Sequence, residues 1–94
     1  MQAPKRGDFV VLRAFQDEPL VRRLWDIGDS GVFVLSDAEY KKRAAGRSSL
    51  DEVGFPIGDC YLYNAHTKSV IDDYQNTGRI DWGVMTLAFP VVHA

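Results

Sequence analysis

Residues 28–31 read Gly-Asp-Ser-Gly, the tetrapeptide that surrounds the nucleophile in one class of serine protease. A catalytic serine needs a histidine that takes its proton and an acid that orients the histidine. In those proteases both partners precede the serine, whereas the histidines of this chain, His66 and His93, follow Ser30. Glycine, aspartate and serine also favour turns, the glycines by allowing a positive φ. The sequence therefore predicts a hairpin turn with glycines at positive φ, and no catalytic serine.

The other chemically active residue types are too few or too scattered to form a site. Cys60 shares a predicted strand face with Leu62, which favours a buried thiol over a nucleophile paired with His66. Zinc prefers four ligands at short spacings, and Asp72 and Asp73 would point about 100° apart on a helix. The chain has no glycine-rich phosphate loop. We therefore predict no catalytic residues, no metal and no cofactor, and we expect that the protein is not an enzyme.

The composition fits one small domain. The chain has 94 residues, of which 46% are hydrophobic and 12% aromatic, too many for a disordered chain. We expect a single domain over residues 1–94, with residues 1–6 as a flexible N-terminus. The single cysteine forbids an internal disulfide bond, and no apolar run is long enough for a membrane span or a signal peptide. These features together predict a cytoplasmic protein without a membrane partner.

The charge is small and unevenly distributed. The net charge is −2, which gives no indication of a polyanionic partner. Residues 1–47 carry nine basic and seven acidic residues, a balance of +2, whereas residues 48–94 carry two basic and six acidic residues, a balance of −4. Because each excess is small, we interpret it as two mutually attracting faces of one domain rather than as a binding surface.

Four runs rich in β-branched and aromatic residues predict strands: 8–15, 20–27, 31–36 and 59–64. The turns between the first three are too short for parallel crossovers, so these strands form an antiparallel meander. The run at 31–36 is apolar without alternation, which indicates a central strand covered on both faces. The loop at 46–58 is apolar at Val53, Phe55 and Ile57, and we expect it to lie against the core.

A first helix is predicted over residues 37–45. Ser36 and Glu39 have the spacing of a capping box, in which each side chain bonds the other residue's backbone N–H. Acidic residues lead and basic residues follow, as the helix dipole favours. Gly46 is a natural left-handed stop. The basic cluster at the end of this helix is interpreted as solvated charge rather than a nucleic-acid contact.

A second helix is predicted over residues 67–77, from the helical spacing of its apolar residues. Thr67 or Ser69 would cap its start, and Gly78 would end it. The segment 79–89 is read as a closing strand or as a short turn that plugs the core, and we prefer the strand. The predicted fold is thus a β-rich α+β domain, a small antiparallel barrel or meander sheet of four to five strands with two short helices.

Aromatic and basic side chains are the remaining candidates for a binding surface. The chain has eleven aromatic residues, more than one small core needs, so some of them can line a groove for an extended peptide. We therefore predict a non-catalytic interaction module that binds a protein or peptide. The candidate binding residues are Arg22, Arg23, Trp25, Tyr61, Tyr63 and Trp82.

The alternative partner is a nucleic acid. Small barrels bind single strands with a basic groove and aromatic side chains that stack on bases. Arg13, Arg22 and Arg23 lie on the first two predicted strands, near aromatic neighbours. Consecutive residues of a strand point to opposite faces, so one of Arg22 and Arg23 should face outward. This reading predicts binding that weakens steeply with salt.

The layout of residues 7–63 resembles the Src-homology-like small β-barrels, a broad group that includes Tudor and KOW domains. The resemblance rests on the Gly-Asp at 7–8 before a hydrophobic strand and on the meander of short strands that follows. It implies a strongly bent barrel. The aromatic pair that peptide-binding members carry in their first loop is missing, because that loop reads Gln-Asp-Glu-Pro at 16–19. The resemblance therefore implies no functional residue.

Overall fold

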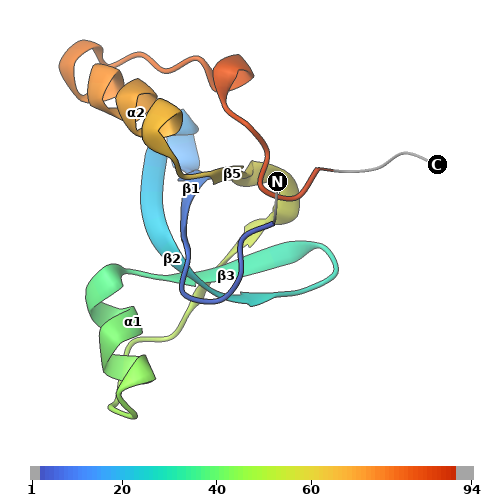
Figure 1. Ribbon diagram of the computed structural model, residues 1–94, viewed down its shortest axis with the longest axis vertical. Coiled ribbons are helices and arrows are strands. Elements are labelled where there is room, and N and C mark those ends of the chain that lie inside the picture. The colour runs from blue at the N-terminus through green and yellow to red at the C-terminus, as the bar shows by residue number, and fades with distance from the viewer. Residues whose placement is uncertain (1–2, 91–94) are drawn as a thin grey trace.

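The computed structural model describes residues 3–90, which form one five-stranded antiparallel sheet with two helices (Figure 1). The strands are β1 (Phe9–Arg13), β2 (Pro19–Ile27), β3 (Gly31–Leu35), β4 (Val53–Pro56) and β5 (Cys60–Leu62). The helices are α1 (Asp37–Ala44) and α2 (Ala65–Thr77). Short 3₁₀ turns occupy Phe15–Asp17, Ile57–Asp59 and Trp82–Val84. The α+β class, the meander of the first three strands and both helices are confirmed.

The sheet is open, with the strand order β4-β3-β2-β1-β5. The barrel form of the prediction is therefore wrong, and the sheet form is correct. A register shift between Leu24 and Asp26 interrupts the pairing of β2 with β3. Such bulges increase the local twist and bend of a strand. Figure 1 shows the consequence: β2 curves, so that β1 and β3 run in very different directions across the sheet.

The two faces of the sheet carry separate hydrophobic clusters, because alternate residues of each strand point to opposite sides. One face holds the first cluster, which the C-terminal segment covers with Ala88 and Phe89. Its buried strand residues are Val10, Leu12, Leu24, Val32, Val34 and Cys60. The other face holds Val11 and Tyr61, which pack against Ile71 of α2 and against Trp82 and Met85. The sheet is thus covered on both sides near β1 and β5.

Helix α1 begins at the predicted residue and ends at Ala44, one residue before the predicted end, but its N-terminal cap is only half formed. Ser36 Oγ accepts a hydrogen bond from the Glu39 N–H at 3.2 Å. The Glu39 carboxylate does not return this bond; it accepts instead from the N–H of Leu50 at 2.8 Å. Gly46 follows the helix with a φ of +74°, which confirms the left-handed stop. The glutamate is therefore used to hold the loop that follows α1.

Helix α2 starts earlier than predicted. Its N-cap is Asn64, whose side chain accepts from the Thr67 N–H at 3.0 Å, so neither Thr67 nor Ser69 is the cap. Thr67 Oγ1 accepts in return from the Asn64 N–H at 2.8 Å and is fully buried. The reciprocal pair satisfies two N–H groups that a helix start leaves free. Gly78 ends the helix with a φ of +71°, as predicted.

Three local expectations are corrected. Residues 46–58 were expected to be a loop against the core, but Val53–Pro56 forms β4, and Val53 is 57% exposed. The preferred closing strand at 79–89 is wrong: this segment makes a 3₁₀ turn and a single bridge between Tyr61 and Leu87, and Trp82 plugs the second cluster. The hairpin at 28–31 is confirmed, but neither of its glycines has a positive φ.

The N-terminal segment contacts the sheet from residue 5 onward. The Lys5 N–H donates to Asp8 Oδ2 at 3.0 Å, and Arg6 Nε donates to the Trp25 carbonyl at 2.6 Å. Residues 1–2 and 91–94, with His93 among them, lie outside the described part of the chain. No helix of residues 3–90 is long and apolar enough to cross a membrane.

Candidate functional site

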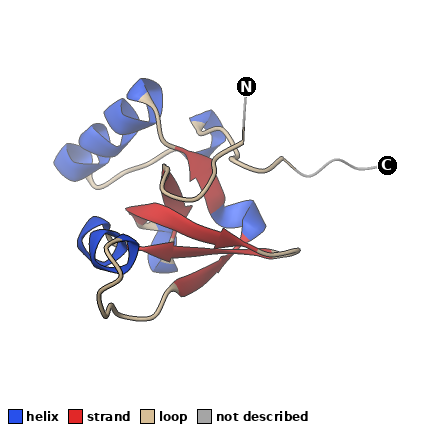
Figure 2. Ribbon diagram, turned by 60° about the horizontal axis from the view of Figure 1, so that its bottom comes forward, coloured by secondary structure: helices blue, strands red, loops and turns tan. Residues whose placement is uncertain are grey.

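A cavity of about 240 Å³ opens where β2 extends beyond the end of β3. Leu20 and Arg22 of β2 form one wall, and Val53 and Phe55 of β4 form another. The remaining lining residues are Val34, Leu35, Ser36, Glu39, Leu50 and Asp51. In Figure 2, α1 stands at one end of the sheet, and a loop leads from it to the outermost strand. The walls are mostly apolar side chains.

Charged side chains position the outer wall of this cavity. Arg43 of α1 donates to Ser49 Oγ at 2.9 Å, to the Leu50 carbonyl at 2.8 Å and to Glu52 Oε2 at 2.7 Å. Glu39 holds the Leu50 N–H, as described above. The same N–H and the Lys42 ammonium lower the pKa of Glu39. Leu50 is 72% exposed, and its backbone N–H and carbonyl are both bonded by side chains of α1. Its side chain therefore stands at the mouth of the cavity without a covering.

Arg23 and Trp25 do not line this cavity; they lie on the other face of the sheet, against α1. The Arg23 guanidinium stacks over the Tyr40 ring at 4.0 Å and donates to Asp37 Oδ1 at 2.9 Å. Arg23 lowers the pKa of Asp37, with a smaller contribution from a neighbouring lysine. The guanidinium groups of Arg6 and Arg43 both stack over the Trp25 ring, at 4.4 and 4.9 Å from its centroid. These contacts fasten α1 to the sheet.

Arg22 differs from its neighbour. It is half-buried and lines the cavity, and its one hydrogen bond within residues 3–90 goes from Nη1 to the carbonyl of Val21 at 2.9 Å. No carboxylate of the described residues lies within 4.0 Å of its guanidinium. The prediction that Arg22 and Arg23 point to opposite faces is confirmed by their packing. Neither, however, is fully exposed.

The remaining predicted residues belong mainly to the second hydrophobic cluster. Tyr61 and Trp82 are buried and pack with ring centroids 4.9 Å apart. Arg13 lies 5.4 Å from the centroid of Trp82 and pairs with Asp17 at 2.8 Å, which lowers the pKa of that carboxyl. Tyr63 is 36% exposed and packs on Phe9. The structure does not bring these aromatic residues together into a groove.

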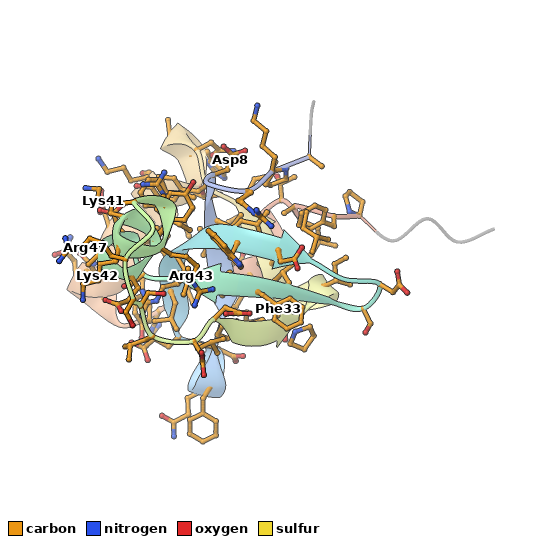
Figure 3. The ribbon with its side chains drawn as sticks, turned by 90° about the horizontal axis from the view of Figure 1, so that it is seen from below. Asp8, Phe33, Lys41, Lys42, Arg43 and Arg47 are labelled. Carbon is orange, nitrogen blue, oxygen red and sulfur yellow. The ribbon has the colours of Figure 1, made fainter. Side chains whose placement is uncertain are left out.

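The basic residues of α1 do not form one cluster either. Figure 3 shows Lys41, Lys42 and Arg47 around α1 and its end, whereas Arg43 lies between the helix and the strands. Lys41 pairs with Asp37 at 3.1 Å, and Lys42 pairs with Glu39 at 2.9 Å. Three of the four therefore have an acidic partner, Arg43 through Glu52. The interpretation as solvated charge fits the exposed Lys41 and Arg47, but it is wrong for Arg43, whose side chain is only 21% exposed.

The residues considered for nucleophilic chemistry are held apart. Ser30 lies at the hairpin tip, where its carbonyl accepts from the Ile57 N–H at 3.0 Å. Cys60 is fully buried in the first cluster, and burial raises the pKa of its thiol to about 12. His66 lies at the start of α2, which covers the opposite face, and its Nε2 is 3.2 Å from the Val84 carbonyl. Within residues 3–90 no three His, Cys, Asp or Glu side chains gather as metal ligands.

The two edge strands of the sheet, β5 and β4, differ in whether another segment bonds their outer side. The outer edge of β5 is covered by the C-terminal segment: the Leu62 N–H donates to the Thr86 carbonyl at 2.8 Å, and the Ala88 N–H donates to the Cys60 carbonyl at 2.9 Å. Strand β4 pairs with β3 alone among the described strands. Its outer edge is therefore free in this part of the chain, directly beside the cavity that Val53 and Phe55 line.

Sequence reasoning identified Arg22 but missed most of the cavity. The other nine lining residues were not among the candidate binding residues, and they include the apolar residues Leu20, Leu50, Val53 and Phe55. A signal for two of them was present, because apolar residues alternate with other residues over 53–57, as they do in a half-buried strand. The interruptions by Gly54 and Pro56 concealed that pattern.

Comparison of the chain with known protein families, with curated proteins and with solved structures finds no match. The resemblance of its layout to the Src-homology-like barrels therefore stays a prediction.

Proposed function

We propose that the protein is a non-catalytic interaction module that binds an extended segment of a protein or peptide along β4, in the cytoplasm. The observation that carries the proposal is the free edge of β4 beside an apolar cavity. Extended peptides commonly bind by adding a strand to an exposed sheet edge, where main-chain bonds give affinity and side-chain pockets give specificity. Both elements of this mode lie next to each other here.

The hydrogen-bonding groups of β4 support this mode. In an antiparallel pair, residues alternate between bonding the neighbouring strand and facing away from it. The bond from the Ile57 N–H to Ser30 places Ile57 on the side of β3, and by alternation Phe55 and Val53 as well. Gly54 then presents its N–H and C=O outward, and Pro56 presents its C=O. These unsatisfied groups are what an added strand would bond.

The size of the cavity indicates what it accepts. An apolar cavity of about 150 Å³ holds a benzene ring, whereas sites for drug-sized ligands enclose roughly 300–1,000 Å³. At about 240 Å³, this cavity fits a single large apolar side chain better than a free small molecule. A peptide strand along β4 would direct alternate side chains to the same face as Val53 and Phe55. One of them would fill the cavity.

The test starts from short random peptides displayed with free C-termini and selected against the whole chain. We expect enriched peptides with an apolar residue at one position. Methylating the peptide's backbone nitrogens one at a time should weaken binding at every second residue, because only those N–H groups face β4. Methylation at the residues between them is the internal control. Failure to enrich any peptide, or a methylation profile without this period of two, would contradict strand addition.

The nucleic-acid alternative remains a weaker proposal. Arg13 and Arg23 are paired with acids, and Arg22 lies on the opposite face from Arg23. The contacts that a basic groove needs are thus already used or divided between two faces. Binding of single-stranded oligonucleotides that falls steeply as salt increases, with no peptide enriched, would favour this alternative over the proposed peptide site.

A further inference from the structure

The cavity beside β4 is lined by an arginine, Arg22, that has no ion-pair partner among residues 3–90. Arg22 uses one of its five N–H groups, on the Val21 carbonyl, and meets no carboxylate among residues 3–90. No side-chain nitrogen or oxygen of the described residues is both sealed from solvent and without a partner. The other N–H groups of Arg22 are therefore accessible to solvent, and Arg22 is one of the residues that line the cavity.

This situation is unusual for an arginine in an apolar setting. Such arginines are normally paired, as Arg23 and Arg43 are in this chain with Asp37 and Glu52. A guanidinium offers two parallel N–H groups that match the two oxygens of a carboxylate. Arg22 thus has the chemistry of a carboxylate receptor whose partner comes from outside the chain.

The acids that line the same cavity do not take this role. Glu39 is already bonded by the Leu50 N–H at 2.8 Å and by Lys42 Nζ at 2.9 Å. Asp51 is exposed and has no ion-pair partner among residues 3–90. Its charge would oppose a second carboxylate nearby. Removing this repulsion by substituting Asp51 therefore tests independently whether the ligand carries a negative charge.

The position of the cavity along β4 indicates which carboxylate is bound. Leu50 and Asp51 precede β4, so the cavity lies at the N-terminal end of this strand, and Ser36 and Glu39 at the start of α1 close its far side. A peptide antiparallel to β4 reaches this end with its own C-terminus. We propose that the bound peptide ends there, with its last side chain in the cavity and its C-terminal carboxylate on the Arg22 guanidinium. This inference rests on the proposed strand addition.

The experiment compares each selected peptide as the free acid and as the C-terminal amide, by fluorescence anisotropy with the whole chain. We expect the acid to bind about 10- to 100-fold more tightly, the range for hydrogen bonds to charged groups. Arg22→Gln should remove this preference, and Arg22→Lys, which keeps the charge but not the paired N–H groups, should retain only part of it. Arg47→Gln is the matched control, since Arg47 is exposed and does not line the cavity.

Asp51→Asn should strengthen binding of the acid, because it removes a like charge, and leave binding of the amide nearly unchanged. Equal binding of acid and amide, or a preference that survives in a folded Arg22→Gln variant, would overturn the inference. Both of those outcomes leave strand addition intact, because the methylation profile tests it separately. Tighter binding of an internal acidic residue, with the terminal amide tolerated, would likewise overturn the C-terminal assignment.

Discussion

Replacing Val53 by phenylalanine should fill the cavity from within the chain. Val53 lines the cavity from β4 and is 57% exposed. Its place at the cavity wall gives a larger side chain room to extend inward, toward Leu20 and Val34. Phenylalanine also has a high propensity for strands, so the change should not disturb the backbone conformation of β4. The variant tests whether the cavity is the specificity pocket of the proposed peptide site.

The expected gain in stability follows from the volume and the area. The cavity of about 240 Å³ exceeds the roughly 150 Å³ that accommodates a benzene ring, so the new ring fits without forcing its walls apart. Burying about 100 Å² of additional apolar surface at ~25 cal/mol per Å² contributes about 2.5 kcal/mol. Ordering the side chain costs ~1 kcal/mol. The net increase in the free energy of unfolding is about 1–2 kcal/mol, which should raise Tm by roughly 4–16 °C.

The assay combines urea unfolding and calorimetry with anisotropy measurements of peptide binding. Val53→Phe should be more stable than the parent chain and should bind selected peptides at least about tenfold more weakly, because its own ring occupies the pocket. Val84→Phe is the matched control: Val84 is 47% exposed and does not line the cavity. It should change neither property. A Val53→Phe variant that gains stability but binds peptide normally would refute the role of the cavity.

Three further outcomes test the fold. Gly7→Ala should lower the free energy of unfolding by about 2 kcal/mol in urea titrations, because Gly7 has a φ of +95° and an added Cβ would lie 2.7 Å from Tyr40 Oη; an unchanged midpoint would contradict this geometry. Thr67→Val should cost about 1–2 kcal/mol and speed amide exchange in α2, since it leaves the Asn64 N–H without its acceptor. Cys60 should resist alkylation at pH 8 until the chain unfolds. Burial raises the pKa of its thiol to about 12 in the folded chain, whereas the unfolded thiol ionises near pH 8.5, so the free energy of unfolding should fall as the pH rises above about 8.5. Rapid alkylation of the native chain would contradict its burial.

The parts of the fold that depend on local signals could be predicted from the sequence. Ser36 and Gly46 mark the two ends of α1, and both signals are local: a hydroxyl cap and a left-handed glycine affect only the backbone within a few residues. The first three strands could be predicted for the same reason, since short turns permit only antiparallel neighbours. The start of α2 was misplaced because a buried threonine can act either as the cap or as its reciprocal partner, and the choice of Asn64 places Thr67 inside the helix.

The candidate site depends on contacts between distant segments, which the sequence does not reveal. Arg22 and Arg23 are identical in type and adjacent, so the pattern places them on opposite faces but cannot say which one finds an acid. Asp37 pairs with Arg23 because Arg23 meets α1 from its face of the sheet, where the guanidinium also stacks on Tyr40. β4 was missed because its glycine and proline weaken the strand signal, and its pairing with β3 supplies the stability that its own propensity lacks.

The open edge of β4 has features that keep it from pairing with itself. Exposed strand edges are templates for aggregation, which proteins limit with short strands, proline and charge. β4 has four residues, ends at Pro56, which has no N–H to donate, and follows Glu52, which is already paired with Arg43. A second copy of β4 would also lack the N–H of Pro56, so two such strands could form fewer hydrogen bonds with each other. A peptide ligand need not, and it can add an apolar side chain for the cavity and a carboxylate for Arg22. The edge is thus better suited to an unlike strand than to a copy of itself.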